Sequence, residues 1–282
     1  MKNLGYYNGK YDELENMQIP MLDRVSFFGD GVYDATYSRN YVIHDLDLHV
    51  DRFFSSAELL GMVPCCTKDE LKSLLCEMVK KVDNPNQFVY FQFTRGTGIR
   101  RHAFPDTEKV KSNLWIVLTP SEIADTYKKV NLITKEDSRF HHCNIKTVNL
   151  IPACIASEEA ESQGAHECVF HRGDEVTECA HSNVHIIKDG VFITHPTDCF
   201  ILPGIARRNL LEKCKQLGIE SSERVFTVDE MMNADEIIIS SAGSFCIAAQ
   251  MIDGKAVGGK APELLKLLQD SLMQDFYDEC GR

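Results

Sequence analysis

The sequence predicts an α+β chain of two domains, and two observations lead to this fold class. The chain has 282 residues, about twice the roughly 150 residues of an ordinary domain. Helix and strand patterns mix in its first part, whereas short strands separated by turns dominate its second part. We therefore expect a smaller α/β domain over residues 1–120, a polar linker over 121–129 and a larger, strand-rich domain over 130–282.

The N-terminal part contains signals for a hairpin, two helices and two further strands. Residues 6–11 carry an Asn-Gly pair that is typical of a hairpin turn. Apolar residues in 46–60 recur at steps of four, three, four and three, which places them on one helical face. Thr67 and Glu70 form a capping-box pattern that opens a second helix. Two runs rich in β-branched and aromatic residues predict strands at 88–94 and 114–118.

The C-terminal part alternates predicted strands with three helices. Strands are expected at 130–134, 167–171, 184–188, 191–195 and 236–241. Helices are expected at 150–162, 205–217 and 261–276. Gly164 and Gly218 follow the first two helices and are typical of helix C-termini. Asp-Gly pairs at 189–190 and 253–254 indicate hairpin turns.

The charge balance argues against broad nucleic-acid binding. The chain carries 30 Lys and Arg against 42 Asp and Glu, a net charge of −12, whereas nucleic-acid binding needs a basic surface. Its apolar runs, such as Ile237–Ile239, are too short to span a bilayer. The first residues show no apolar core of a signal peptide. We therefore expect a cytoplasmic protein that binds neither nucleic acid nor membrane.

The metal-binding and nucleotide-binding signatures are missing from the sequence. Eleven cysteines are present without any CxxC pair, which indicates buried free thiols in a reducing compartment. The ten histidines show no ligand spacing, so we expect no metal. The GxGxxG, GxxxxGK[ST], HExxH and GxSxG motifs are also absent. Hydride transfer, P-loop chemistry and α/β-hydrolase chemistry therefore lose their usual signatures.

Lys146 and Glu178 are the first candidates for chemistry. Lys146 lies among apolar neighbours between a strand-like segment and a helix start, where desolvation would turn an amine into a usable nucleophile. The alternative is a lysine whose stem packs and whose ammonium reaches water. Glu178 ends a strand before a polar turn and could hold a protonated ring nitrogen. As an isolated residue it could equally cap a turn.

Two loops are suited to binding an anion. Residues 202–208 open a helix with Pro and Gly, which leaves the first backbone N–H groups of the helix available. Residues 240–244 follow a strand and are rich in small hydroxyl side chains, a composition typical of an anion-binding turn. Together with an amine and a carboxylate, these loops indicate a phosphate-bearing cofactor.

Several motifs in the same order resemble those of the fold-type IV aminotransferases, which depend on pyridoxal 5'-phosphate (PLP). Within that family the sequence is most similar to the D-amino acid aminotransferases. The matching stretches cover nearly the whole chain: Phe28–Tyr33, His49–Arg52, Tyr90–Thr97, Ile145–Asn149, Thr177–Glu178, Ser182–Val184 and Ile201–Ile205. The resemblance implies a C-terminal domain built as a pseudo-barrel and a homodimer with shared active sites.

The resemblance also implies a role for each cofactor-binding residue. Lys146 would bind PLP as a Schiff base and then move the α-proton of the substrate, and Glu178 would keep the pyridine nitrogen protonated. Leu202 would pack on the ring. The phosphate would be bound by Arg52, Ile205, Ala206, Ser241 and Ala242. Alanine at 206 and 242 replaces hydroxyl residues that are common in the family, so we expect weaker retention of PLP.

The substrate side is assigned by the same resemblance. Tyr33, Arg100 and His102 would bind the α-carboxylate, with the last two contributed by the neighbouring subunit. Read without the family, residues 100–102 are a solvated basic turn. The expected reaction moves amino groups between D-alanine or D-glutamate and 2-oxoglutarate or pyruvate. Aminodeoxychorismate lyase, branched-chain L-amino acid aminotransferase and a non-enzymatic binding protein are the alternatives, and the Arg-x-His pattern favours D-amino acid transamination.

Overall fold

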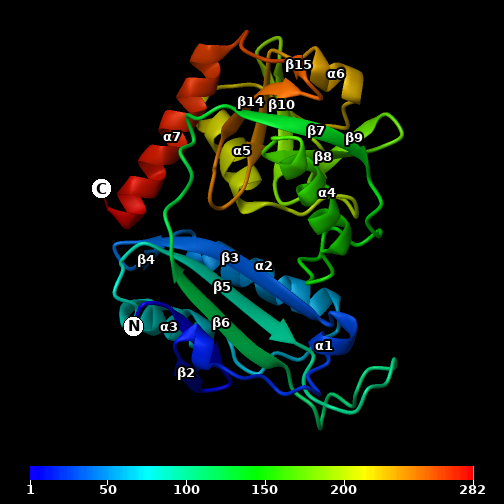
Figure 1. Cartoon of the computed structure of the whole chain (residues 1–282). Helices are drawn as coiled ribbons and strands as arrows, with labels where there is room; N and C mark the ends of the chain where they lie inside the picture. Colours follow the sequence, from blue (N-terminus) through cyan, green and yellow to red (C-terminus); the bar gives the residue numbers. More distant parts are fainter. Residues whose placement is uncertain (282) are drawn as a thin grey trace. The chain divides into compact units, whose positions relative to one another are not determined.

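The computed structural model describes residues 1–281, whose contacts form two compact units (Figure 1). The first unit comprises Met1–Ile123, Ile145–Asn149 and the chain from Tyr277 on. The second comprises Ala124–Asn144 and Leu150–Phe276. This division differs from the expected one in two short segments, because Ile145–Asn149 and the chain end make their contacts with the N-terminal sheet.

The first unit is built on an antiparallel sheet of six strands in the order β2-β1-β6-β5-β3-β4. The strands are β1 Leu4–Tyr7, β2 Lys10–Asp12, β3 Gly31–Arg39, β4 Val42–Ile43, β5 Gln87–Thr94 and β6 Asn113–Pro120. The helices are α1 Val25–Phe28, α2 Leu46–Leu59 and α3 Lys68–Met78, with 3₁₀ turns at Leu14–Asn16 and Val79–Lys81. Phe53 of α2 stacks on Phe93 of β5 with ring centroids 4.3 Å apart. That contact joins helix and sheet in one core.

Local signals in this unit predicted its elements well. Asn8 and Gly9 have φ of 45° and 91° in the β1–β2 turn. Thr67 and Glu70 form the reciprocal hydrogen bonds of a capping box at the start of α3. The prediction missed β3, whose buried positions include Asp34, Thr36 and Ser38. Polar residues on the buried face hide the apolar alternation that signals a strand.

The second unit contains a nine-stranded mixed sheet in the order β12-β11-β10-β13-β14-β7-β8-β9, with β15 paired to β14. The strands are β7 Val130–Glu136, β8 Glu167–Arg172, β9 Glu175–Cys179, β10 Asn183–Lys188, β11 Val191–Thr194, β12 Ser221–Glu223, β13 Glu236–Ser240, β14 Ile247–Ile252 and β15 Lys255–Ala256. The helices are α4 Ile151–Ser162, α5 Ile205–Leu217, α6 Val228–Met232 and α7 Pro262–Cys280. The expected α+β class with a strand-rich second part is therefore confirmed.

Three features of the second unit bear on the site. Gly218 ends α5 in the left-handed conformation, with φ of 70°, as expected for a glycine at this position. The adjacent strands β10 and β13 are almost completely buried. Helix α7 extends four residues beyond its expected end at Phe276 and reaches Cys280. Within residues 1–281, no helix is both long and apolar enough to cross a membrane.

Candidate active site

The backbone of Ile145–Asn149 lies beside β3 in the first unit and presents Lys146 to Tyr33. The Tyr33 N–H donates to the Lys146 carbonyl oxygen at 2.9 Å, and Val32 forms a β-bridge with Thr147. The Lys146 Nζ lies 3.4 Å from the Tyr33 hydroxyl and 4.4 Å from the centre of its ring. Lys146 is half-buried. The structure thus joins the predicted amine to one predicted substrate residue.

Tyr33 is supported from behind by a second tyrosine. The rings of Tyr33 and Tyr90 stack with centroids 5.3 Å apart, and the Tyr90 hydroxyl donates to Gln92 Oε1 at 2.5 Å. Burial raises the pKa of Tyr90, and the neighbouring Tyr33 adds to the shift. Tyr90 therefore stays neutral and holds the Tyr33 ring in place.

Arg52 of α2 forms a two-bond ion pair with Asp34 of β3. Its Nε and Nη2 atoms each lie 2.8 Å from an Asp34 carboxylate oxygen. The buried His49 contacts the same carboxylate through Nδ1 at 2.7 Å. Burial opposes the ionised carboxylate, but the charges of Arg52 and His49 hold the pKa of Asp34 well below its usual range. Asp34 therefore remains ionised and fixes the direction of the Arg52 guanidinium.

Arg100 and His102 meet at the ring of Phe28. The Arg100 guanidinium lies 5.2 Å from the ring centre, and the His102 ring lies 5.3 Å from it. The Arg24 Nη1 donates to the carbonyl oxygen of Arg101 at 2.6 Å, which anchors the loop backbone. All three side chains from 100 to 102 are exposed. The structure therefore groups the two predicted carboxylate-binding residues and leaves Arg101 outside their contact with Phe28.

Glu178 of β9 is the centre of a buried charged network in the second unit. Its Oε1 accepts from Arg139 Nη1 at 2.6 Å. Its Oε2 accepts from Asn183 Nδ2 at 3.0 Å and from the Leu202 N–H at 2.9 Å. Three donors stabilise the anionic form of a carboxylate. Glu178 is therefore suited to pair with a cationic ring nitrogen.

Arg139 is a site residue that sequence reasoning missed. It bridges Glu178 and Asp137, with Nε 2.9 Å and Nη2 3.0 Å from the two Asp137 oxygens. Burial works against its charge, but the hydrogen bond to Asp137 and the charge of Glu178 raise the pKa of Arg139. No periodic pattern marks Arg139, because it lies outside any helix or strand and its partner Glu178 is 39 residues away.

Asn183 joins Glu178 to the start of α5. Its Nδ2 donates both to Glu178 and to the Leu202 carbonyl oxygen, the latter at 3.0 Å. A Cβ on residue 204 would overlap Asn183 Oδ1, so glycine is required there. Gly204 gives α5 no side-chain cap, and the N–H groups of Ile205 and Ala206 therefore begin the helix without one. A helix start of this kind favours an anion.

The second predicted anion-binding loop begins at the end of β13. Ser240 pairs directly with Asn183 in the β10–β13 register. Ser241 and Ser244 share a hydrogen bond between their hydroxyls at 2.8 Å, and Ala242 and Gly243 form the tip of the turn between them. The turn therefore starts beside the residue that contacts Glu178, Leu202 and Gly204.

His185 is the other residue that sequence reasoning missed. It is fully buried in β10, where Nδ1 lies 2.8 Å from the Thr194 hydroxyl and Nε2 lies 2.8 Å from the Ser240 hydroxyl. Arg207 of α5 reaches the same Thr194 hydroxyl with Nε at 3.2 Å. Burial, together with the charge of Arg207, lowers the pKa of His185 to about 3. A neutral histidine thus connects the start of the Ser241 turn with the first turn of α5.

These groups fit a cofactor that carries both a phosphate and a pyridine ring. Within the second unit, Glu178 offers an anionic acceptor, and the N–H groups opening α5 and the 241–244 turn offer phosphate donors. The first unit supplies the amine of Lys146. A fold of this class with such a site defines an aminotransferase-type enzyme.

The comparison with protein families agrees with that assignment. The family described as amino-transferase class IV matches residues 31–252. The chain belongs to this family of aminotransferases.

Curated relatives match over nearly the full chain. A D-alanine aminotransferase of Bacillus licheniformis is 33% identical over 279 residues, which cover 98% of each chain. A D-alanine aminotransferase of Staphylococcus epidermidis is 37% identical over 268 residues, or 94% of each chain.

Solved structures share the fold. The branched-chain amino acid aminotransferase of Escherichia coli aligns with a TM-score of 0.87 and 20% identity, covering 99% of this chain and 96% of that one. A second branched-chain amino acid aminotransferase, from a T.th. strain and complexed with N-(5'-phosphopyridoxyl)-L-glutamate, gives a TM-score of 0.87 and 22% identity, covering 99% and 94%.

Proposed function

We propose that this enzyme transfers amino groups between D-amino acids and 2-oxo acids with PLP as its cofactor. D-alanine and D-glutamate are the proposed donors, and 2-oxoglutarate and pyruvate are the acceptors. The observation that carries the proposal is the contact of the Lys146 amine with the Tyr33 hydroxyl. It places a nucleophilic amine beside a group able to bind a substrate carboxylate. The curated relatives named D-alanine aminotransferase support the choice of D-substrates.

PLP, when bound, supplies an electron sink that stabilises negative charge at the substrate α-carbon. We assign Glu178 to the ring nitrogen and Leu202 to the ring face. The phosphate would be bound by the N–H groups of Ile205 and Ala206, by Ser241 and Ala242, and by Arg52. Asp34 holds Arg52 in direction, and Arg139 keeps Glu178 ionised.

Lys146 has two tasks in this proposal. Its Nζ links the cofactor to the protein and, once the substrate amine has taken that place, accepts the α-proton and returns it to the other partner. Tyr33 limits the positions of Nζ through its hydroxyl and ring face. Tyr90 keeps that ring from turning. The amine therefore stays directed while it changes protonation state.

Arg100, His102 and Tyr33 are the proposed carboxylate-binding residues, with Arg100 and His102 reaching the active site of the neighbouring subunit in a homodimer. The exposed loop that carries them supports this proposal. Ile99 and Phe104 flank the two residues and are 86% and 61% exposed. Large apolar side chains at that exposure are typical of a surface that a partner covers. An Arg-x-His pair suits a carboxylate and therefore favours transamination over the lyase reaction.

We also infer that the enzyme works in the cytoplasm. All eleven cysteines are free thiols, six of them buried, and free thiols in this number persist in reducing compartments.

The proposal is tested by the absorption spectrum of the purified enzyme and of Lys146→Ala. Wild type should show a borohydride-reducible cofactor linkage and a spectrum that changes with D-alanine and hardly with L-alanine. Lys146→Ala should lose both the linkage and turnover, because no amine remains at that position. Lys128→Ala, at an exposed bend, is the matched control and should behave as wild type. A retained linkage in Lys146→Ala, or a wild type that prefers L-alanine, would contradict the proposal.

A further inference from the structure

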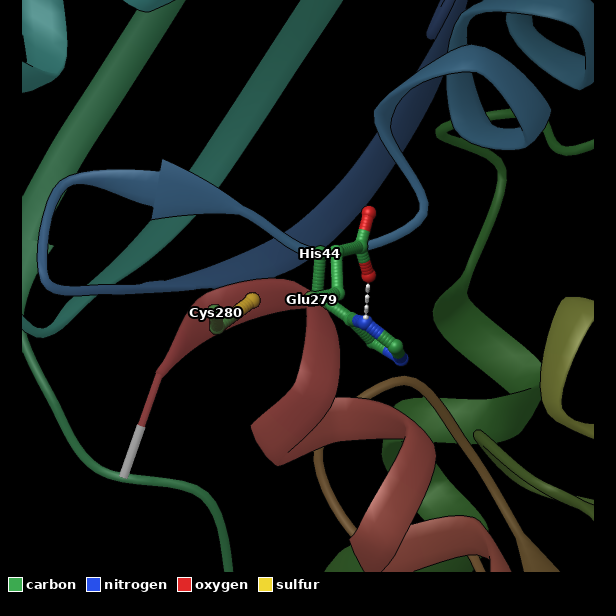
Figure 2. A group of neighbouring side chains, drawn as sticks. All are labelled: His44, Glu279 and Cys280. Carbon is green, nitrogen blue, oxygen red and sulfur yellow. Dashed lines mark hydrogen bonds and ion pairs between the residues drawn. The ribbon is translucent and has the colours of Figure 1, made fainter.

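A cluster of three potential metal ligands lies in the first unit, among residues that the transamination site does not use. Figure 2 shows His44, Glu279 and Cys280 beside one another. Their ligand atoms all lie within 4.8 Å of one another. His44 lies between β4 and α2, and Glu279 and Cys280 form the last turn of α7. The cluster therefore offers one nitrogen, one oxygen and one sulfur donor.

The backbone on both sides of the cluster is tied in place. The Asp45 N–H lies 3.2 Å from both oxygens of the Glu279 carboxylate, and Asp45 adopts a left-handed conformation with φ of 52°. Asn40 Nδ2 donates to the Cys280 carbonyl oxygen at 3.0 Å, and Arg39 Nε donates to that of Gly281 at 2.9 Å. These bonds hold the corner at Asp45 and the end of α7 in a set arrangement.

The imidazole of His44 lies between two carboxylates. Its Nδ1 is hydrogen-bonded to Glu279 Oε2, as Figure 2 shows. Its Nε2 lies 3.3 Å from Asp45 Oδ2. Metal-binding histidines commonly donate their second ring N–H to a carboxylate, which orients the ring. Asp45 occupies that position for a metal bound at Nδ1.

The protons of the cluster are ones that a metal ion would displace. Cys280 is 2% exposed, and burial together with the charge of Glu279 raises the pKa of its thiol to about 12. Burial favours a neutral Glu279, but the hydrogen bond from His44 keeps the pKa of that carboxyl low. A dication would replace the Nδ1 proton and release the thiol proton, leaving the Nε2 proton directed at Asp45.

We propose that His44 Nδ1, the Glu279 carboxylate and the Cys280 thiolate form a Zn²⁺ site with water as the fourth ligand. A mixed set of nitrogen, oxygen and sulfur donors suits Zn²⁺. The two anionic ligands balance the charge of the ion. Glu279 is exposed, so the ion can enter and leave without unfolding. No sequence spacing signals this site, because His44 and Glu279 are 235 residues apart.

The test is calorimetric titration of Zn²⁺ into the full-length, PLP-loaded enzyme, repeated with Co²⁺ followed by absorption. Wild type should bind one ion, and Co²⁺ should give a thiolate-to-metal band. Cys280→Ser should lose the band and the binding event. Asp45→Asn should weaken binding about 10- to 100-fold, because the ring loses its orienting carboxylate. Asparagine also tolerates the left-handed backbone at this position. Cys76→Ser, at an exposed thiol of α3, is the matched control and should bind as wild type.

Glu279→Gln keeps the test decisive if Cys280→Ser does not fold. The glutamine is close in shape, its side chain is exposed, and it removes the anionic ligand. Zn²⁺ should raise the melting temperature of wild type and of Cys76→Ser but not that of Glu279→Gln. Equal Zn²⁺ binding by wild type and Glu279→Gln, or no binding by wild type, would overturn the proposal.

Discussion

The buried carboxylate of Glu178 is satisfied by donors from three directions, and this arrangement determines what a substitution would do. Arg139, Asn183 and the Leu202 N–H all point hydrogens at its two oxygens. A glutamine amide at 178 would keep the size of the side chain but would direct its own hydrogens at one set of these donors. The change therefore removes the anionic charge and strains the network at once.

We expect Glu178→Gln to bind PLP but to lose kcat by about 100- to 1000-fold, because the charge partner of the ring nitrogen is gone. The measurement is kcat for D-alanine with 2-oxoglutarate, alongside the cofactor content of the purified protein. Glu175→Gln changes an exposed residue of the same strand and should leave kcat intact. Unaltered turnover in Glu178→Gln would remove this residue from the cofactor site.

Arg100 and Arg101 are neighbours in sequence but differ in their surroundings. Arg100 lies over Phe28 beside His102, whereas Arg101 is held through its backbone oxygen. We expect Arg100→Ala to raise KM about 10- to 100-fold for D-alanine and D-glutamate alike, because both share the carboxylate. Arg101→Ala should affect D-alanine little and D-glutamate more. Steady-state kinetics of both variants decide this, and unchanged D-alanine kinetics in Arg100→Ala would refute the carboxylate assignment.

At the scale of elements, strands β10 and β13 connect the two anion-binding loops of the second unit. Asn183 begins β10 and Ser240 ends β13, and the two residues are paired. His185 lies two residues further along β10 and hydrogen-bonds to the Ser240 hydroxyl and to Thr194 of β11. The histidine is buried and neutral, so folding depends on its protonation state.

This dependence has a defined sign. The pKa of His185 falls from 6.5 to about 3 in the folded protein. Below pH 6.5 the unfolded chain binds a proton that the folded chain excludes, so stability is full above that pH and declines as the pH falls toward 3. From pH 7.5 to 5.5 this group should lower the free energy of unfolding by about 1.4 kcal/mol.

The measurement is urea unfolding of wild type and His185→Asn at both pH values, at equal protein and cofactor concentrations. The stability advantage of wild type over the variant should shrink by that amount at the lower pH. The subtraction removes the contribution of the other histidines. An advantage that stays constant, or that grows at low pH, would show that His185 takes up its proton in the folded protein.

At the scale of the whole molecule, the proposed homodimer predicts complementation between inactive variants. Lys146 would serve the active site of its own subunit, whereas Arg100 would serve that of the partner. A dimer of one Lys146→Ala subunit and one Arg100→Ala subunit would then contain one intact site. Coexpression should therefore restore turnover to about a quarter of wild type with random pairing.

The control for complementation is a pair of variants on the same side of the site. Coexpressed Lys146→Ala and Glu178→Gln both lesion residues assigned to one subunit, so their heterodimer should contain no more activity than the Glu178→Gln subunit retains. Sedimentation of wild type should show a dimer. Failure of Lys146→Ala and Arg100→Ala to complement in a demonstrated heterodimer would place Arg100 in the site of its own subunit.

The sequence by itself determined the elements that short-range chemistry controls. The Asn8-Gly9 turn, the Thr67 capping box and the glycine after α5 follow from local backbone preferences and hydrogen bonds a few residues apart. The identity of the amine and acid candidates, Lys146 and Glu178, also came from their local settings and from motifs shared with a known family. Such signals need no knowledge of how distant segments meet.

Only the tertiary structure decided which distant residues touch. Strand β3 went unnoticed because its buried positions carry Asp34 and other polar residues, whose value depends on partners such as Arg52 from another element. The contacts of Arg139 with Glu178 and of His44 with Glu279 join positions 39 and 235 residues apart. Periodicity reports which face of an element is buried but not what covers that face. Long-range contacts arise from the packing of whole elements, and only folding brings those side chains together.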